Sequence, residues 1–336
     1  MNNRCLTALA IISALLASSP AAHAQDGKTY VMKLSTATLN DPQHEWLKRF
    51  AAAVEKDSGG RIKGEVYPAS QLGSIPRQIE GTQFGSIQGW VGPPEFLVGV
   101  DPRYEALSAP ALFSSAEQHL RVMNDPPVND MLLGLGANKG LMGVSAYPTG
   151  PSAIAARKPV RHLADYAGMK IRVLASPFQL EMIKRMEASP VAMSLADVLP
   201  AIQQGAVDGA LGTIPVFGPL HYVDTAKYLM EIGQPYVSVI IIMNKQWVEA
   251  LPADLQKIIH DDATAVSKEI VPYSNDFFEG QRVEWKNKGG ELITLPADEQ
   301  SALIAKLSSI GDDLSKDKPD LNKAVDLVAE SAKRNK

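Results

Sequence analysis

The sequence predicts an α/β protein built from two domains, and three observations support this. Short apolar stretches with the length of buried strands alternate with helical patterns along the chain, which is typical of parallel sheet covered by helices on both faces. The chain has 336 residues, 45% hydrophobic and 21% charged, which suits a large core and roughly two domains. Because no linker rich in Gly, Pro or Ser separates two halves, we expect the chain to cross between the domains more than once.

Residues 1–24 predict a secretory signal peptide. A positively charged start at Arg4 precedes an apolar stretch over 6–16, and 22–24 (AHA) has the small-x-small pattern that signal peptidase cleaves. Cleavage would place the mature protein in the periplasm. It would also remove Cys5, the one cysteine of the sequence, which excludes redox chemistry, thiol nucleophiles and cysteine-based zinc sites.

The first half of the mature chain reads as strands and helices in alternation. A helix opens at Pro42 and carries Trp46, Phe50 and Val54 on one face before 59–60 (GG) ends it. The other elements expected here are strands at 29–36, 61–68, 87–91 and 141–147, a short helix from Ser74, and a helix with a capping box at Ser115 and Gln118.

The second half continues the alternation. A helical pattern covers 252–288 and is interrupted by Pro272, which we expect to kink or break it. The longest apolar run after the signal peptide, 237–243, has the length of a buried strand and not of a membrane span. The remaining elements expected are strands at 169–174, 207–211 and 291–295, and helices at 177–187, at 196–204, from Pro296 and from Leu321.

Signatures of an enzyme are weak. Residues 134–140 (GLGANKG) resemble a dinucleotide-binding fingerprint, but a helix precedes them and a strand follows, which reverses the order that the motif needs. This run therefore predicts a loop that ends a helix. The histidines show no metal-binding spacing, and the net charge of −4 argues against a nucleic-acid partner. We expect no cofactor and no metal site, although a nucleophile and a base could still meet in space.

Arg172 is the strongest candidate for a binding residue. It lies near the carboxyl end of the apolar strand 169–174, where a guanidinium is costly to bury unless it faces a cleft or a partner. Residues 176–179 (SPFQ) form a capping box that starts a helix beside it, so free backbone N–H groups and a cation come together as an anion site. The alternative is that Arg172 pairs with a structural carboxylate such as Asp208 or Glu187, and spacing does not decide between the two.

A resemblance to a known family follows from several motifs in order. Residues 157–173 (RKPVRHLADYAGMKIRV) resemble the K-P-I and D-L-x-G-x-K-I-R stretch of the periplasmic solute-binding proteins of TRAP transporters, the DctP-like family. The motifs that agree with this are 59–62 (GGRI), 66–68 (VYP), 71–73 (QLG), 109–113 (APALF) and 201–209 (AIQQGAVDG). Together they cover nearly the whole mature chain.

The resemblance implies a periplasmic-binding-protein (Venus-flytrap) fold with hinge strands and a long spanning helix. The first α/β domain is then expected to comprise 25–148 and about 238–275, and the second about 149–237 and 276–336 with the C-terminal helices. The implied function is capture of a small organic carboxylate between the domains and delivery to the membrane permease subunits of a TRAP-type secondary transporter. In that family, the arginine matching Arg172 forms a bidentate salt bridge with the ligand carboxylate.

Two other functions remain possible on the sequence. A binding protein for another importer or for a sensor kinase would share the fold and the cleft. A periplasmic hydrolase or isomerase is the alternative from another class, against which the weak enzyme signatures argue.

Two departures from the family pattern bear on the ligand. Many relatives carry a second arginine where this chain has Ser152, and a polar pair where it has 210–212 (ALG), ending at Gly212. A site without these groups predicts a monocarboxylate with an aromatic or aliphatic body, or a 2-oxo acid, and not a dicarboxylate or sialic acid. The aromatic side chains that could line the site, or could simply belong to the core, are Trp90, Phe96, Tyr147, Phe178, Phe217 and Tyr236.

Overall fold

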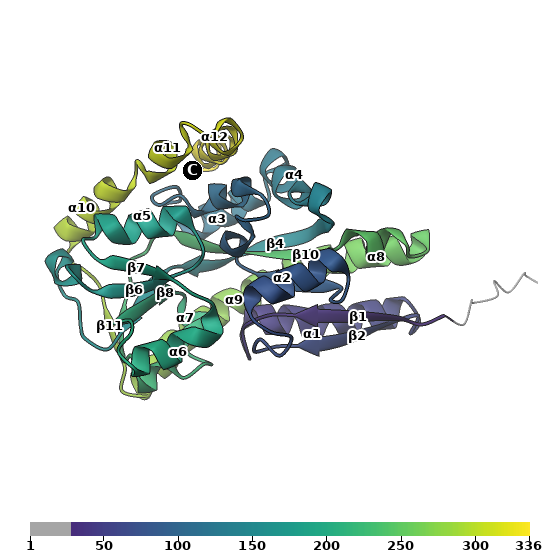
Figure 1. Ribbon diagram of the computed structural model, residues 1–336, viewed down its shortest axis with the longest axis horizontal. Coiled ribbons are helices and arrows are strands. Elements are labelled where there is room, and N and C mark those ends of the chain that lie inside the picture. Colours follow the sequence, from purple (N-terminus) through teal and green to yellow (C-terminus); the bar gives the residue numbers. More distant parts are fainter. Residues whose placement is uncertain (1–27) are drawn as a thin grey trace, which may run out of the picture.

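Two β-sheets with helices packed around them form the protein (Figure 1). The computed structural model describes residues 28–336, so the predicted signal peptide lies outside the described residues. The two sheets and the helices around them confirm the predicted α/β fold class. The first sheet has the order β2 (Ile62–Tyr67), β1 (Tyr30–Ser35), β3 (Gly89–Gly92), β10 (Tyr236–Asn244) and β4 (Leu141–Pro151). The second has the order β11 (Glu291–Ile293), β9 (Tyr228–Met230), β5 (Ala153–Ala156), β8 (Gly209–Gly212), β6 (Lys170–Val173) and β7 (Ser189–Ala192).

The chain passes between the sheets several times. It crosses from β4 to β5 at Ser152 and returns from β9 to β10 through 231–235. The long helix α9 (Ala253–Asn287) then contacts β4 of the first sheet and β11 of the second. These crossings explain why the sequence contains no single linker. The exact division into two domains remains a prediction.

Helix α1 (Pro42–Asp57) forms where the sequence predicts it. The Asp41 side chain accepts the His44 amide at 3.0 Å, so it caps the helix in front of Pro42. The apolar face around Trp46 and Phe50 is fully buried against the first sheet and α9. Burial of each such aromatic side chain contributes about 1.5–3 kcal/mol to the free energy of unfolding.

Of the kink or break expected at Pro272, the break is not present, because α9 continues as one helix of 35 residues. Proline removes one backbone hydrogen bond from a helix interior. Here Ile259, Val266 and Ile270 are buried in the core of the first sheet, and Trp285 is buried in the core of the second. Packing at both ends of α9 therefore outweighs the local effect of Pro272.

The other predicted helices and strands are present within a few residues of their expected bounds. The run 134–140 does end a helix and lead into β4, so the loop reading is confirmed. The remaining helices are α2 (Ile75–Phe84), α3 (Ala116–Met123), α4 (Pro126–Gly134), α5 (Pro177–Arg185), α6 (Leu195–Gln203), α7 (Ile214–Phe217), α8 (Lys245–Glu249), α10 (Ala297–Leu307), α11 (Ile310–Ser315) and α12 (Pro319–Arg334), with 3₁₀ turns η1 (Pro94–Leu97) and η2 (Pro102–Ser108).

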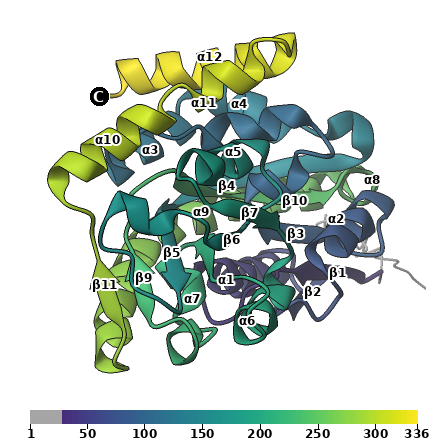
Figure 2. The ribbon, with the colours of Figure 1, turned by 60° about the vertical axis from the view of Figure 1, so that its left-hand side comes forward.

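The C-terminal helices bridge the two halves of the molecule. Helices α10 and α11 pack on α5, whereas α12 packs on η2, α3 and α4 (Figure 2). Across residues 28–336, no helix combines the length and hydropathy that a membrane span needs.

Candidate functional site

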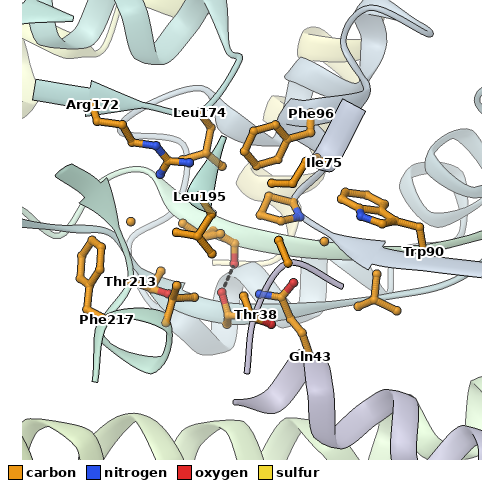
Figure 3. A pocket seen from close by; sticks show the side chains of 18 residues that line it. Thr38, Gln43, Ile75, Trp90, Phe96, Arg172, Leu174, Leu195, Thr213 and Phe217 are labelled. Carbon is orange, nitrogen blue, oxygen red and sulfur yellow. Dashed lines mark hydrogen bonds between the residues drawn. The ribbon is translucent and has the colours of Figure 1, made fainter. Parts of the chain in front are cut away.

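A mainly apolar cavity lies between the two sheets (Figure 3). Its empty volume, which includes the solvent space at its opening, is about 570 Å³. The first sheet and its connections contribute Trp90 and Phe96, and the second contributes Arg172 and Phe217. The full lining is Ala37, Thr38, Gln43, Ile75, Trp90, Val91, Gly92, Pro93, Phe96, Thr149, Arg172, Leu174, Leu195, Gly212, Thr213, Val216, Phe217 and Val237.

Strand β6 places Arg172 in this cavity. Its neighbours Ile171 and Val173 are fully buried in the core, and because side chains alternate along a strand, Arg172 points to the opposite face. Strands β7 and β8 run parallel to β6 on its two sides. The arginine thus lies toward the carboxyl ends of parallel strands, where ligands bind in open α/β sheets.

The Arg172 guanidinium is buried, with 2% of the residue exposed, and it is incompletely paired. Its Nε donates to the Met193 carbonyl and its Nη1 to the Leu211 carbonyl, both at 3.0 Å. The Nη2 atom has no hydrogen-bond partner within residues 28–336. Burial lowers the pKa of Arg172 to about 10, so the side chain remains charged at neutral pH.

The alternative that Arg172 pairs with an internal carboxylate does not hold in this structure. Asp208 accepts the Lys170 amide at 2.8 Å and lies 3.7 Å from Arg157. Glu187 lies 3.1 Å from Lys306. Among residues 28–336, Arg172 is also the only ionisable side chain in the cavity lining. A buried cation without an anion is unfavourable by several kcal/mol, so the cavity is suited to receive an anion.

Trp90 offers a second unpaired donor on the other side of the cavity. The residue is 1% exposed and its Nε1 has no partner among the described residues. Its ring lies against the backbone of Gly92, where a Cβ would be 2.3 Å from the Trp90 Cζ2 atom. Gly92 therefore allows the indole to lie flat along β3.

Gly212 makes room for Phe217 in the same way. A Cβ at Gly212 would lie 2.7 Å from the Cζ atom of the Phe217 ring. Where the family pattern has a polar pair, 210–212 (ALG) of this chain therefore leaves space for the aromatic face of Phe217.

Several polar lining residues were not predicted. Thr38 follows the carboxyl end of β1, and Thr213 follows that of β8, so the strand-end rule that identified Arg172 could have found both. The Thr38 Oγ1 atom donates to Asp41 at 2.7 Å, and Gln43 Nε2 donates to Asp41 at 3.3 Å. This carboxyl group lies behind the cavity wall and holds the Thr38 and Gln43 side chains in place. Its burial raises the pKa of Asp41 to about 6.

The structure brings five of the predicted candidates together and places four elsewhere. Trp90, Arg172, Gly212 and Phe217 line the cavity, and so does Phe96. The four that do not line it lie in the surrounding packing, since Tyr147 and Phe178 are core residues, Ser152 donates to the Gln234 carbonyl at 2.6 Å, and the ring of Tyr236 lies 6.2 Å from that of Phe113.

The N-terminus of α5, which we expected to help hold a ligand carboxylate, is occupied by the protein itself. Ser176 caps the helix by accepting the Gln179 amide at 3.0 Å, as the sequence predicts. The Phe178 amide, however, donates to the carboxylate of Glu105 at 2.7 Å. Glu105 comes from η2, far away in the sequence, and it takes the place that an external anion would have used.

Comparison with known proteins gives a consistent result. Residues 34–317 match the family model DctP, described as "Bacterial extracellular solute-binding protein, family 7". The 2,3-diketo-L-gulonate-binding periplasmic protein YiaO of Escherichia coli (strain K12) is 26% identical over 98% of this chain and 100% of its own length. The C4-dicarboxylate-binding periplasmic protein DctP of Rhodobacter capsulatus is 26% identical over 85% of this chain and 86% of its own length.

Solved structures share the fold. A TRAP periplasmic solute-binding protein from Desulfovibrio salexigens with bound orotic acid has a TM-score of 0.87 and 23% identity, covering 92% of this chain and 100% of its own. The sugar acid binding protein DctPAm from Advenella mimigardefordensis in complex with galactonate has a TM-score of 0.88 and 20% identity, covering 92% of this chain and 99% of its own.

Proposed function

Since the chain belongs to the DctP family, family 7 of the bacterial extracellular solute-binding proteins, we propose that it captures a small organic carboxylate in the cavity between its two sheets. It delivers this anion to the membrane subunits of a TRAP-type secondary transporter. The relatives whose names state a location are periplasmic, and the predicted signal peptide agrees with that location. The protein is a binding protein and performs no reaction on the anion.

The observation that carries this proposal is the unpaired charge of Arg172. Of its five N–H groups, two are used by backbone carbonyls, and Nη2 is unpaired. A ligand carboxylate would accept from the free edge of the guanidinium and neutralise it. Charge-assisted pairs of this kind are about twice as strong as neutral hydrogen bonds.

The lining favours a monocarboxylate with an apolar body. One cation faces the cavity, and the other side chains are mostly aromatic or aliphatic. Two similar structures hold sugar acids, D-glucuronate in one and galactonate in the other. Here Thr38, Gln43, Thr149 and Thr213 supply the polar lining, and the Thr149 hydroxyl is already bonded to the Val237 carbonyl at 3.0 Å. A polyhydroxylated acid would leave several buried hydroxyl groups unpaired, each at a loss of about 1–3 kcal/mol.

A 2-oxo acid also fits this lining. Its carboxylate would bind Arg172, and its oxo group could accept from the free Nε1 of Trp90. Because Arg172 and Trp90 belong to different sheets, such a ligand would contact both halves together. A ligand that does so stabilises the closed arrangement over an open one.

Mass spectrometry under native conditions and a thermal-shift panel test the proposal. We expect the largest stabilisation from acids such as benzoate, phenylacetate or 4-methyl-2-oxopentanoate, and smaller shifts from D-glucuronate, galactonate and succinate. Binding should be stoichiometric, with the acid recovered unchanged. Arg172→Ala should abolish the shift, and Arg172→Lys should keep part of it. Equal affinity of the parent and Arg172→Ala for the best acid would overturn the proposal, and turnover of that acid would favour an enzyme.

A further inference from the structure

A pair of buried carboxyl groups lies beside the cavity. Glu95 in η1 and Glu105 in η2 are each 1% exposed. Both belong to the stretch that follows β3 of the first sheet. Glu95 accepts the Ser108 hydroxyl at 2.8 Å within that stretch, and both glutamates also bond to groups around the start of α5, which follows β6 of the second sheet. Neither takes part in an ion pair within residues 28–336.

Three hydrogen bonds join these carboxyl groups to the second half of the molecule. The Ser176 hydroxyl donates to Glu105 Oε1 in a short hydrogen bond, and the Phe178 amide donates to the same oxygen at 2.7 Å. The Gln179 side chain donates to Glu95 Oε1 at 3.4 Å. We call Glu95, Glu105, Ser176 and Gln179 the latch. The Oε2 atoms of both glutamates are buried without a partner among the described residues.

The latch and the cavity share the same two chain segments. Phe96, which lines the cavity, follows Glu95 directly, and Leu174, another lining residue, lies two residues before Ser176. A movement that opens the cavity between the sheets would therefore also separate the latch.

Ionisation of the latch is linked to its burial. Burial is the main cause that raises the pKa of Glu95 and of Glu105 to about 7, and the charge of Glu95 adds to the rise for Glu105. The hydrogen bonds from Ser176 and Phe178 oppose the rise. When the halves separate, water reaches both groups and their pKa values return toward about 4.3.

Charged groups on the elements packed against the latch do little to lower the pKa of either glutamate. Lys318, at the start of α12, lowers the pKa of Glu105 as the last of its causes, and no cation contributes to the pKa of Glu95. Strand β10 carries no Asp, Glu, Lys or Arg. The remaining charges on the elements packed there lie at exposed or half-buried positions, namely Arg77 and Glu80 on α2, Arg103 on η2, Glu181, Lys184 and Arg185 on α5, and Asp320, Lys323, Asp326, Glu330, Lys333 and Arg334 on α12.

We propose that Glu105 is a positioning residue for ligand binding: together with Glu95 it holds the two halves closed while the pair keeps at least one proton, and it releases them when both groups ionise. The closed state binds more protons than the open state between about pH 4.3 and 7. Closure is therefore favoured below neutral pH and weakens as pH rises through about 7. This inference rests on the proposed function only in taking the closed state as the one that holds the carboxylate.

A distance measurement without any ligand tests the latch. Lys63 on β2 and Gln204 after α6 are exposed and lie on different halves, so Lys63→Cys and Gln204→Cys, combined with Cys5→Ser, give two spin-label sites in the full chain. Double electron–electron resonance then reports the closed fraction at pH 5.5 and 8.5. We expect the ratio of closed to open protein to fall about tenfold or more between these values, since one proton linked over one pH unit changes the ratio about tenfold.

Matched variants separate charge from packing. In Glu95→Gln combined with Glu105→Gln, the amide oxygens still accept the latch bonds but cannot ionise, so the closed fraction should be the same at both pH values. Glu105→Ala should lower the closed fraction at both. Glu80→Gln, an exposed change on α2, should behave as the parent. Arg172→Ala should keep the pH response even if it binds no acid, which distinguishes failure of the latch from failure of the proposed function.

Two results would overturn the latch. One is an identical pH response in the parent and in the double glutamine variant. The other is a ligand-free parent protein that is open to the same extent at both pH values.

Discussion

The cavity and the latch both bury charge between the two sheets, but with opposite signs. Within residues 28–336, the cavity holds one guanidinium that is paired with no carboxylate, and the latch holds two carboxyl groups that are paired with no cation. Arginine cannot shed its charge near neutral pH, so Arg172 requires an anion from outside. A carboxyl group can take up a proton instead. On the proposed function and the proposed latch, the difference teaches that one region is completed by a ligand and the other by a proton.

Replacing Arg172 by methionine is the strongest way to test the first half of this comparison. Removal of one partner of a buried charged pair weakens binding by about 2–5 kcal/mol, or roughly 30- to several-thousand-fold. The ligand-free protein should become more stable, because an unpaired buried cation is replaced by an apolar chain of similar volume. Titration calorimetry and thermal unfolding measure both effects. Lower stability together with unchanged affinity would contradict the assignment.

The latch should matter for affinity even though none of its four residues lines the cavity. Glu105→Ala leaves the Ser176 hydroxyl and the Phe178 amide without their partner, at a loss of about 1–3 kcal/mol, or roughly 5- to 150-fold in affinity for the best monocarboxylate at pH 6. Glu105→Gln should keep most of the affinity that Glu105→Ala loses. An Ala variant that binds as the parent does would show that the latch is not coupled to the cavity.

The pH dependence of affinity should reveal the proton of the latch. Because the pKa of each glutamate is raised to about 7 in the closed state, affinity should fall as pH rises toward 7 and then level off, by about tenfold per pH unit for one linked proton. Calorimetry at pH 6 in buffers of different ionisation enthalpy should detect proton uptake. Glu95→Gln with Glu105→Gln should abolish both effects, and uptake that persists in this variant would place the proton elsewhere.

Trp90→Phe gives the smallest expected effect, and it distinguishes a 2-oxo acid from an acid without an oxo group as the ligand. It keeps an aromatic face and removes the free Nε1 donor. A 2-oxo acid should lose about 0.5–1.5 kcal/mol, one neutral hydrogen bond, whereas phenylacetate should lose little. The comparison of 4-methyl-2-oxopentanoate with 4-methylpentanoate in the two proteins measures this. Equal losses for both acids would show that the indole N–H does not contact the oxo group.

Sequence reasoning predicted best what is set by local structure. The helix starting at Pro42, the strand at 237–243 and the Ser176 cap depend on periodicity and capping within a few residues. Pro272 predicts a kink or a break in the helix over 252–288, but α9 continues through it, because its support comes from two distant cores. Helix packing decided that case against local propensity.

The candidate site shows the same limit. The position of Arg172 at a strand end made it a candidate, because a buried cation needs a partner, but spacing left a structural carboxylate as an equal alternative and the family resemblance favoured the cavity. Glu105 could not be predicted, because it meets the α5 N-terminus across 73 residues of sequence. Tyr147, Phe178 and Tyr236 look like cavity residues in sequence, yet the structure uses them in packing. Aromatic type alone does not separate a lining residue from a core residue.

A crystal structure with a bound monocarboxylate tests the central claim most directly. The account predicts a carboxylate oxygen about 2.7–2.9 Å from Arg172 Nη2, with the body of the ligand between Trp90 and Phe217. A carboxylate bound elsewhere, with Nη2 still unpaired or turned to an internal Asp or Glu, would contradict it.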